Sequence, residues 1–297
     1  MNIAVIFAGG SGTRMTNADK PKQFLLVHGK PIIVHTIEIF QKHPEIDGIV
    51  VACLVDWIPY VEEMKKRYGL DKIGAIVPGG ETGQMSIYSG LKAAAGVYGL
   101  YSPDSAAGGT PDGVSVPEND SPGSSAGGTP DGVSVPENDS PGSAAGQDNA
   151  PSVEGKERNI VLIHDGVRPL IDAKVISDNI AAVKKYGSAI TCTPAQETVI
   201  LVRDEKTKRQ TEHVESVPAR RLSRFAKAPQ SFFLGDILSV EERAISEGRT
   251  DMIDSCTLMN EYGYQLHTVI GPKINIKITT PEDFIIFRAL YDEFENE

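Results

Sequence analysis

The sequence predicts an α/β fold whose centre is a doubly wound, mostly parallel β-sheet. Apolar segments of strand length alternate with amphipathic segments of helical length along most of the chain. The strands are apolar at nearly every position, which is typical of a parallel sheet covered by helices on both faces. With 297 residues, 40% of them hydrophobic, the chain is long enough for one large domain. We expect that domain to span residues 1–297, with an interruption at about 101–158.

Five strands and four helices are expected before Pro194. The stretch "IAVIFA", which follows Met1 and Asn2, is the first buried strand. Pro31 and Pro59 stand near the starts of two helices, where proline is favoured because an N–H in the first turn has no partner. The expected strands are Asn2–Phe7, Gly48–Leu54, Gly74–Val77, Asn159–Ile163 and Ser188–Thr193. The expected helices are Pro31–Lys42, Trp57–Tyr68, Gly83–Ala95 and Ala173–Tyr186. A ligand crevice is expected at the carboxyl ends of the strands.

The pattern changes after Pro194. Apolar and polar residues alternate there around a charged turn, Asp204–Lys208, which predicts a protruding β-arm over about residues 195–220. A protruding hairpin has exposed edges that tend to pair with another chain, so we expect a homodimer that forms through the arm. Helical patterns return at the end of the chain. They cover Gly235–Glu247, Asp254–Tyr262 and Glu282–Glu293.

A repeated segment interrupts the domain. The stretch "AGGTPDGVSVPENDSPGS" stands at Ala107–Ser124 and again, unchanged, at Ala126–Ser143. Each copy has only two valines as apolar side chains, so it cannot bury enough surface to offset the entropy lost on ordering. We therefore expect a disordered insert at about 101–158 that arose by tandem duplication. A docking tail for a partner is the alternative.

Composition argues against several classes of function. The net charge is −11, and ten acidic and two basic residues between Tyr101 and Arg158 carry −8 of it. This acidic balance argues against nucleic-acid binding. No apolar run is as long as a membrane span, and no leader pattern precedes the first strand. The three cysteines, Cys53, Cys192 and Cys256, show no CxxC spacing and predict reduced thiols in a cytoplasmic protein.

The clearest candidate for a binding site is the glycine-rich loop directly after the first strand. In "IFAGGSGTRM", Ile6–Met15, the glycines allow backbone N–H groups to converge on an anion, although a plain turn also needs glycines. The spacing matches neither a P-loop nor GxGxxG. Arg14 closes the loop, and Lys20 and Lys22 follow in "KPKQF". Backbone donors together with two or three cations are what a triphosphate requires.

Five motifs, in order, resemble the cytidylyltransferases that make CDP-alditols. They are "FAGGSGTRM…KPKQF", "PGGETGQMSI", "HDGVRPLI", "APQSFF" and "NIKITTPEDF", and the resemblance covers residues 2–100 and 159–295. It implies a Rossmann-like sheet of the nucleotidyltransferase type and transfer of CMP from CTP to D-ribitol 5-phosphate or to 2-C-methyl-D-erythritol 4-phosphate. It also implies Mg²⁺, bound mainly through the CTP phosphates, and no metal ligand of the chain is assigned.

The resemblance assigns the nucleotide to three segments. The first loop, which wraps the triphosphate, contributes Phe7, Ala8, Gly9 and Gly10. The segment that recognises cytosine and ribose contributes Gly80, Glu81, Thr82, Gly83, Gln84, Met85 and Ser86. Asp165 and Arg168 of "HDGVRP" are expected to line the crevice. His164 beside them is expected to be structural, because a phosphate nucleophile is already ionised and needs no general base. A general base is the alternative role for His164.

The resemblance also assigns the cations that assist the transfer. Arg14 and Lys22 match the residues that stabilise charge at the α-phosphate, and Lys20 is the other lysine of the motif. An oxygen of the acceptor phosphate attacks the α-phosphorus in line and pyrophosphate leaves, so no covalent intermediate is needed.

The acceptor phosphate has its own set of expected residues. Lys277 matches a lysine of the family, and Thr279 stands next to it. Arg220, with Arg221 as the alternative, and Thr198 match residues that the arm carries into the neighbouring subunit. Lys277 and Arg220 are therefore expected to complete the catalytic set.

Three segments favour ribitol 5-phosphate as the acceptor. They are "DWIPYVEEMKKRYGL", "IDSCTL" and "VPAR", which resemble the ribitol branch of the family. Ala228 departs from the threonine that is usual before "PQ". Two other readings stay open. One is a nucleotide sensor without turnover, which would not need the transition-state cations; the other is a hexose-1-phosphate nucleotidylyltransferase, which would not explain "HDGVRP" with "NIKITTP".

Overall fold

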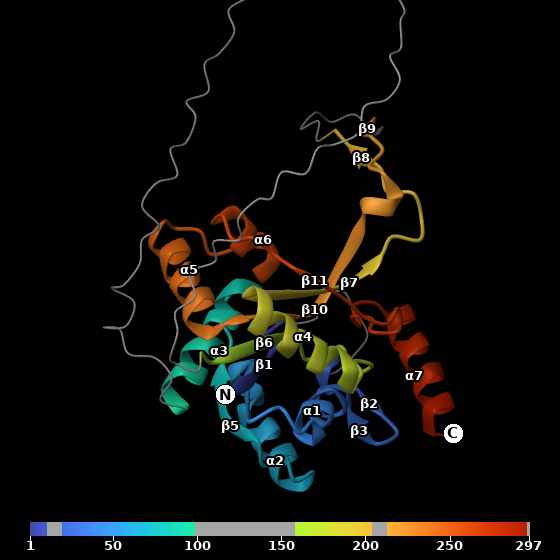
Figure 1. The fold of residues 1–297 in the computed structure, drawn as a ribbon. Coiled ribbons are helices and arrows are strands. Elements are labelled where there is room, and N and C mark those ends of the chain that lie inside the picture. The colour runs from blue at the N-terminus through green and yellow to red at the C-terminus, as the bar shows by residue number, and fades with distance from the viewer. Residues whose placement is uncertain (11–19, 99–157, 204–212, 296–297) are drawn as a thin grey trace, which may run out of the picture. The chain divides into compact units, whose positions relative to one another are not determined.

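The computed structural model describes residues 1–10, 20–98, 158–203 and 213–295, and its centre is a seven-stranded sheet (Figure 1). The strands in spatial order are β11 (Thr268–Ile270), β7 (Ser188–Pro194), β10 (Arg224–Phe233), β6 (Ile160–Asp165), β1 (Asn2–Ala8), β4 (Gly48–Cys53) and β5 (Ile73–Pro78). β10 is antiparallel to both of its neighbours, and the other neighbouring pairs are parallel. The expected mostly parallel α/β fold is confirmed.

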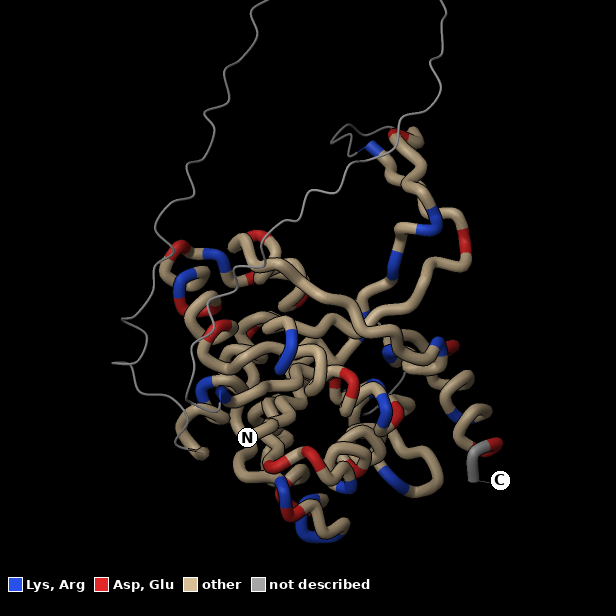
Figure 2. Tube along the Cα trace, in the orientation of Figure 1, with Lys and Arg blue, Asp and Glu red and all other residues tan. Residues whose placement is uncertain are grey.

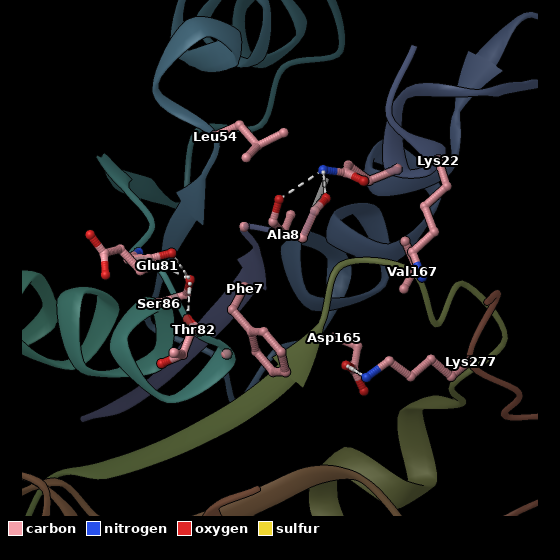
Figure 3. Close-up of a pocket in the computed structure, with 15 residues that line it drawn as sticks. Phe7, Ala8, Lys22, Leu54, Glu81, Thr82, Ser86, Asp165, Val167 and Lys277 are labelled. Carbon is pink, nitrogen blue, oxygen red and sulfur yellow. Dashed lines mark hydrogen bonds and ion pairs between the residues drawn. The ribbon is translucent and has the colours of Figure 1, made fainter. Parts of the chain in front are cut away.

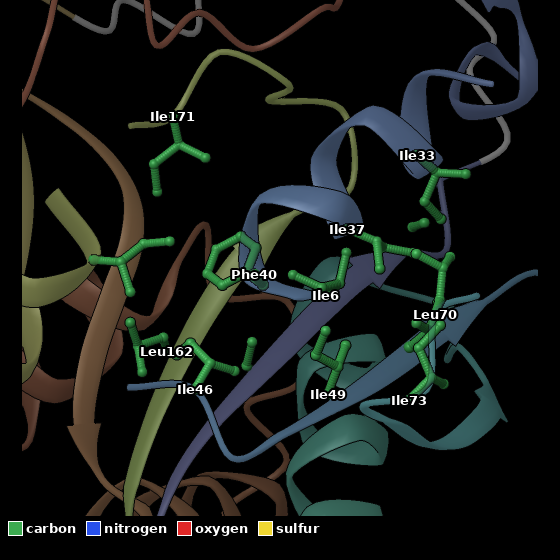
Figure 4. Packing of buried hydrophobic residues seen from close by; sticks show 14 of the residues in the cluster. Ile6, Ile33, Ile37, Phe40, Ile46, Ile49, Leu70, Ile73, Leu162 and Ile171 are labelled. Atoms are coloured by element: carbon green, nitrogen blue, oxygen red, sulfur yellow. The ribbon is translucent and has the colours of Figure 1, made fainter. Parts of the chain in front are cut away.

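Helices cover both faces of the sheet, and the side chains of β1 show why. Ala4 and Ile6 belong to one core cluster, part of which is drawn in Figure 4, whereas Ile3 and Val5 belong to another. Successive side chains of a strand point to opposite faces, so both faces of β1 are buried. The first cluster includes residues of α1 (Ile32–Lys42), α2 (Ile58–Arg67) and α4 (Ala173–Tyr186). The second includes residues of α3 (Gly83–Val97), α5 (Leu234–Ser246) and α6 (Ser255–Glu261).

A third and smaller cluster forms around α7 (Pro281–Glu295). Phe287 of α7 is fully buried and belongs to the same cluster as Val27, Val167 and Ile278. Val27 lies in β2 (Leu26–Val27), which forms a two-stranded sheet with β3 (Lys30–Pro31). The cluster therefore joins three segments that are far apart in the sequence, and each of them follows a residue predicted for the site.

Two strands of the sheet are absent from the sequence prediction. β10 lies between β6 and β7 although it contains Pro229, which has no backbone N–H to donate to a neighbouring strand. The register with β7 shifts between Ala226 and Gln230, so the proline falls at an irregularity of the ladder. The other strand, β11, has three residues and is too short for periodicity to reveal it.

The region of the expected arm is described only in part. β8 (Leu201–Val202) pairs antiparallel with β9 (Val214–Ser216) in a two-stranded sheet of its own. The expected turn Asp204–Lys208 lies in 204–212, outside the described residues, and the protruding arm stays a prediction. The insert expected at about 101–158 likewise lies outside them, as far as residue 157.

Charged residues of both signs are spread over the described parts of the chain. Figure 2 shows acidic and basic positions interspersed along the described chain, as on α2, where glutamates precede lysines and an arginine. Within the described ranges, no helix is long and apolar enough to cross a lipid bilayer. Cys53, Cys192 and Cys256 are all free thiols.

Candidate active site

A cavity of about 520 Å³ opens at the carboxyl ends of β1, β4, β5 and β6 (Figure 3). Its lining includes twelve residues that the sequence predicts for the site: Phe7, Ala8, Gly9, Gly10, Lys22, Gly80, Glu81, Thr82, Gly83, Ser86, Asp165 and Lys277. The other described residues of the lining are Gln23, Leu54 and Val167. The cavity therefore lies where the strand ends of a doubly wound sheet place a ligand.

The glycine loop lies tightly against the segment that follows β5. A Cβ at Gly9 would stand 2.5 Å from the hydroxyl oxygen of Ser86, so any larger residue would displace that hydroxyl. The Ser86 hydroxyl donates to the carbonyl of Thr82, at 3.0 Å, and accepts from the N–H of Gly80, at 3.1 Å. Ser86 thus holds the turn between β5 and α3 in shape while it faces the glycine loop.

The first turn of α3 is fixed by side chains on both sides of it. Thr82 caps the helix by accepting from the Met85 N–H at 3.1 Å, and its hydroxyl donates to the carbonyl of Thr250. Gln84 is buried and points into the protein, where it donates to Glu241 at 2.9 Å. Gln84 also donates to the Arg249 carbonyl and accepts from the Met252 N–H.

Two of the residues predicted for the nucleotide lie outside the described lining of the cavity. Neither Gln84 nor Met85 is among the described residues that line the cavity. The reason is helical geometry, because one face of α3 turns toward the cavity while Gln84 packs against α5. Burial raises the pKa of Glu241 to about 7, and the hydrogen bond from Gln84 opposes this in part.

Asp165, at the end of β6, is held by two cations. Lys277 Nζ lies 2.7 Å from one carboxylate oxygen (Figure 3). Arg168 Nε lies 2.6 Å from the other. Burial alone would raise the pKa of Asp165, but Arg168 and Lys277 outweigh burial and hold it well below its usual range. Asp165 is therefore ionised at neutral pH, and it holds the ammonium group of Lys277 at the cavity wall.

Arg168, which is expected to line the crevice, is not among the described lining residues and holds Asp165 instead. Besides Asp165, it donates to the carbonyl of Asn275 at 3.0 Å, and its side chain is 11% exposed. Lys227 donates to the same carbonyl at 2.9 Å. Asn275 lies two residues before Lys277, so both cations hold the segment that carries Lys277.

His164 is enclosed in the core beneath the site. Its exposed fraction is 0%, and its Nε2 donates to the carbonyl of Arg168. The centroid of its ring lies 5.1 Å from the ring centroid of Phe40. Burial lowers the pKa of His164 to about 4, with Asp165 opposing. A neutral and inaccessible imidazole fits the expected structural role.

Of the remaining predicted residues, Thr198, Arg220 and Thr279 are not among the described residues that line the cavity. Arg14 falls in 11–19, outside the described residues. Thr198 is exposed between β7 and β8, and Arg220 is exposed on a 3₁₀ helix, Arg220–Leu222, where it donates to the Gln196 carbonyl at 3.3 Å. The Thr279 hydroxyl donates to Asp283 at 2.7 Å, so it is engaged at the start of α7.

The described residues offer little to a metal ion. No group of three or more His, Cys, Asp or Glu side chains within them is placed to hold one. Among the described lining residues, Glu81 and Asp165 are the carboxylates, and both oxygens of Asp165 already have cationic partners. A divalent ion at this site would need most of its ligands from a bound molecule.

A glycine-lined cavity with lysines at its edge, at the carboxyl ends of a doubly wound sheet, defines the chain as an α/β protein that binds a phosphorylated ligand. The sequence matches the family described as 2-C-methyl-D-erythritol 4-phosphate cytidylyltransferase (IspD) over residues 2–99 and 147–293. The chain belongs to this family of cytidylyltransferases, and it is therefore a nucleotidyltransferase that uses CTP.

Individual relatives agree with the family. The chain is 47% identical to the ribitol-5-phosphate cytidylyltransferase of Streptococcus agalactiae serotype III, over 100% of this chain and 98% of that protein. It is 30% identical to the 2-C-methyl-D-erythritol 4-phosphate cytidylyltransferase of Geobacter metallireducens, over 98% and 97%. The crystal structure of 4-diphosphocytidyl-2C-methyl-D-erythritol synthase from Anaerococcus prevotii superposes with a TM-score of 0.66 at 22% identity, covering 98% of this chain and 96% of that one, and shows the same fold.

Proposed function

We propose that the chain transfers CMP from CTP to D-ribitol 5-phosphate, forming CDP-ribitol and pyrophosphate. The observation that carries this proposal is the 47% identity, over the whole chain, with a protein named for that reaction, against 30% with one named for the methylerythritol substrate. Transfer to 2-C-methyl-D-erythritol 4-phosphate is the second candidate, because the family description names it.

The proposed reaction is an in-line displacement at the α-phosphorus. An oxygen of the ribitol phosphate forms a bond to that phosphorus, the bond to the bridging oxygen breaks, and pyrophosphate leaves with the electron pair. The glycine loop binds the triphosphate through its backbone, and Lys22, together with Arg14, stabilises the negative charge that develops. Mg²⁺, held mainly by the CTP phosphates, supplies further neutralisation when bound.

The acceptor phosphate is assigned to Lys277. Its ammonium lies at the cavity and is oriented by Asp165, at 2.7 Å. A phosphate that enters the cavity beside CTP can pair with this cation. Arg220 and Thr198 lie away from this cavity, so their proposed contribution is to the cavity of a second subunit.

The proposal includes a homodimer, which is supported by exposed apolar side chains near β8, β9 and the start of β10. Leu201, Val214, Val217, Leu222 and Phe225 are 50% to 69% exposed. Such a group of apolar side chains is typical of an interface. Sedimentation of the unmodified chain is expected to give a dimer, and a monomer at working concentration would contradict this part. A cytoplasmic location is also proposed, on the strength of the three free thiols.

A pyrophosphate-release assay tests the proposal. The chain is supplied with CTP, Mg²⁺ and either D-ribitol 5-phosphate or 2-C-methyl-D-erythritol 4-phosphate. We expect kcat/KM to be at least about a hundredfold higher for ribitol 5-phosphate, because a site whose hydrogen-bonding groups match a substrate strongly rejects an analogue that lacks their partners. The reverse preference would establish the second candidate, and the absence of release with both would refute the proposed reaction.

A further inference from the structure

Gln23 connects the glycine loop to the short helix that carries Lys22. It lies between Lys22 and Phe24 on the 3₁₀ helix Lys22–Phe24 and is 1% exposed. Its side-chain Nε2 donates to the carbonyl of Ala8, at 2.8 Å, and to that of Gly10, at 3.2 Å. Both amide hydrogens of one buried side chain are thus directed at the glycine loop.

These two hydrogen bonds fix how the loop presents its backbone. The peptide between Ala8 and Gly9 is planar, so holding the Ala8 carbonyl also sets the direction of the Gly9 N–H. On its other side, Gly9 already lies against the Ser86 hydroxyl. The loop is held between Gln23 and Ser86, and neither contact requires a bound ligand.

The short helix that carries Gln23 is itself anchored. The ring of Phe24 stacks on Trp57, with centroids 4.3 Å apart, and meets the edge of Tyr60 at 5.4 Å. The Phe24 N–H donates to the carbonyl of Pro21 at 2.9 Å. The backbone at residues 22–24 is therefore fixed against the start of α2, and a displacement of the loop is transmitted to this helix.

We propose that Gln23 is a positioning residue that sets the glycine loop and Lys22 in register with each other. It acts through the carbonyls of Ala8 and Gly10 and through the backbone of its neighbour, Lys22, and it takes no part in bond making. This inference rests on the proposed function, in which the loop binds the CTP phosphates and Lys22 stabilises the transferred charge. Loss of the amide should then affect CTP binding and turnover together.

Gln23→Met tests the inference because it keeps the volume of the side chain and removes both donors. We expect KM for CTP to rise and kcat to fall, each by about tenfold, since small displacements of catalytic groups are costly, while KM for the alditol phosphate changes by less than about twofold. The matched control is Gln230→Met. Gln230 is also buried, and its amide donates to Asp254 and accepts from the Cys256 N–H, but it is not among the described lining residues.

The control separates positioning from general stability. We expect both variants to lower the midpoint of thermal unfolding by similar amounts, because each loses two hydrogen bonds of a buried amide. Only Gln23→Met should change KM for CTP and kcat. Equal kinetic effects of the two variants, or unchanged kinetics in Gln23→Met, would overturn the inference.

Gln23→Glu provides a second readout that does not depend on stability. At high pH the introduced carboxylate faces two carbonyl oxygens and repels them, whereas its protonated form donates one hydrogen bond. We expect kcat/KM for CTP, relative to the unmodified chain, to recover as the pH is lowered from about 8 to about 6. A relative rate that does not depend on pH would contradict a role for the donors.

The outcomes also distinguish this inference from the function on which it rests. If the unmodified chain releases pyrophosphate from CTP and the Gln23 variants behave like it, the function holds and the positioning role fails. If the unmodified chain releases none, the function fails first, and direct CTP binding by calorimetry then decides whether Gln23→Met still weakens the glycine loop.

Discussion

Ser86 and Gln84 belong to the same turn of α3, and both form hydrogen bonds within the protein. Arg168 does likewise, since it holds Asp165 and the carbonyl of Asn275. At the scale of single residues, the cavity is thus shaped by polar side chains that support the residues facing it. Support of this kind reduces the freedom that the facing groups would otherwise lose on binding a ligand.

Lys22→Ala is expected to keep the fold and the affinity for CTP while turnover falls by at least about a hundredfold, because a cation that contacts developing charge contributes most in the transition state. Pyrophosphate release measures turnover, and calorimetry measures CTP binding.

Lys20→Ala is the matched control for Lys22→Ala. The Lys20 ammonium lies 5.7 Å from the ring centroid of Tyr60, and Lys20 is exposed. Its removal should change turnover by less than about threefold, since an exposed cation is largely screened. A larger loss in Lys20→Ala than in Lys22→Ala would exchange the roles of the two lysines.

Sequence reasoning finds the residues that line the site more readily than the side chains that support them. Lys22, Asp165 and Lys277 stand in motifs whose chemistry suggests a phosphate, and all three line the cavity. Gln23 stands in the same motif as Lys22, but an amide carries no charge that would single it out. Arg168 could not be distinguished from a ligand-binding arginine, because only the folded chain shows that its donors are directed at Asp165 and Asn275.

At the scale of elements, α7 joins the parts of the site. Val27, Val167 and Ile278 follow Lys22, Asp165 and Lys277 in the sequence, and all three belong to the cluster around Phe287. A shift of α7 should therefore move the surroundings of several site residues at once.

Phe287→Ala should lower the free energy of unfolding by about 3–5 kcal/mol, because it opens a cavity in a packed cluster. We expect KM for the acceptor to rise as well, since Ile278 is adjacent to Lys277. Urea unfolding and steady-state kinetics measure the two effects. Ile285→Ala on the same helix is the control, because Ile285 is 66% exposed and should change stability by less than about 0.5 kcal/mol.

Periodicity predicts the elements that follow one pattern and misses those that do not. The five expected strands and the expected helices lie within a few residues of their predicted bounds, because burial on one or both faces leaves a regular apolar pattern. β10 is the informative exception. A proline in its middle argues against a central strand, yet a shift of register lets it lie between β6 and β7.

At the scale of the whole molecule, two buried groups give stability opposite dependences on pH. The His164 pKa is lowered to about 4 by burial, so below its ordinary value the unfolded chain binds a proton that the folded chain does not. The Glu241 pKa is raised to about 7, also by burial, so in the same range the folded chain binds a proton that the unfolded chain does not. Acidification from neutral pH therefore weakens the fold through His164 and strengthens it through Glu241.

Each contribution is removed by one substitution. When the pH is lowered from 7 to 5, the free energy of unfolding of His164→Leu should rise by about 2 kcal/mol relative to that of the unmodified chain. The free energy of unfolding of Glu241→Gln should fall by about 2 kcal/mol relative to it over the same change. Chemical denaturation at the two pH values measures both differences. Parallel pH profiles for all three proteins would show that neither group is titrated differently in the folded chain.

Deletion of residues 103–155 should leave turnover within about threefold, since shortening a loop changes its closure entropy only slowly. The described residues on either side have their own anchors. The Tyr98 hydroxyl donates to the Lys72 carbonyl, and Arg158 pairs with Asp236 and stacks on the ring of Phe233. Pyrophosphate release and thermal unfolding of the shortened chain measure the outcome, and loss of folding would mean that the segment is structural.

The ion pair between Asp165 and Lys277 has a consequence for the catalytic cycle. A pocket prepared for phosphate gathers positive charge, and such charge repels itself while no substrate is present. Asp165 acts as an internal counter-ion during that interval. Under the proposed function, the incoming phosphate must compete with the Asp165 carboxylate for Lys277, so binding of the phosphate replaces one ion pair with another. After the transfer, Asp165 can pair with Lys277 again, and re-formation of this ion pair favours release of the product.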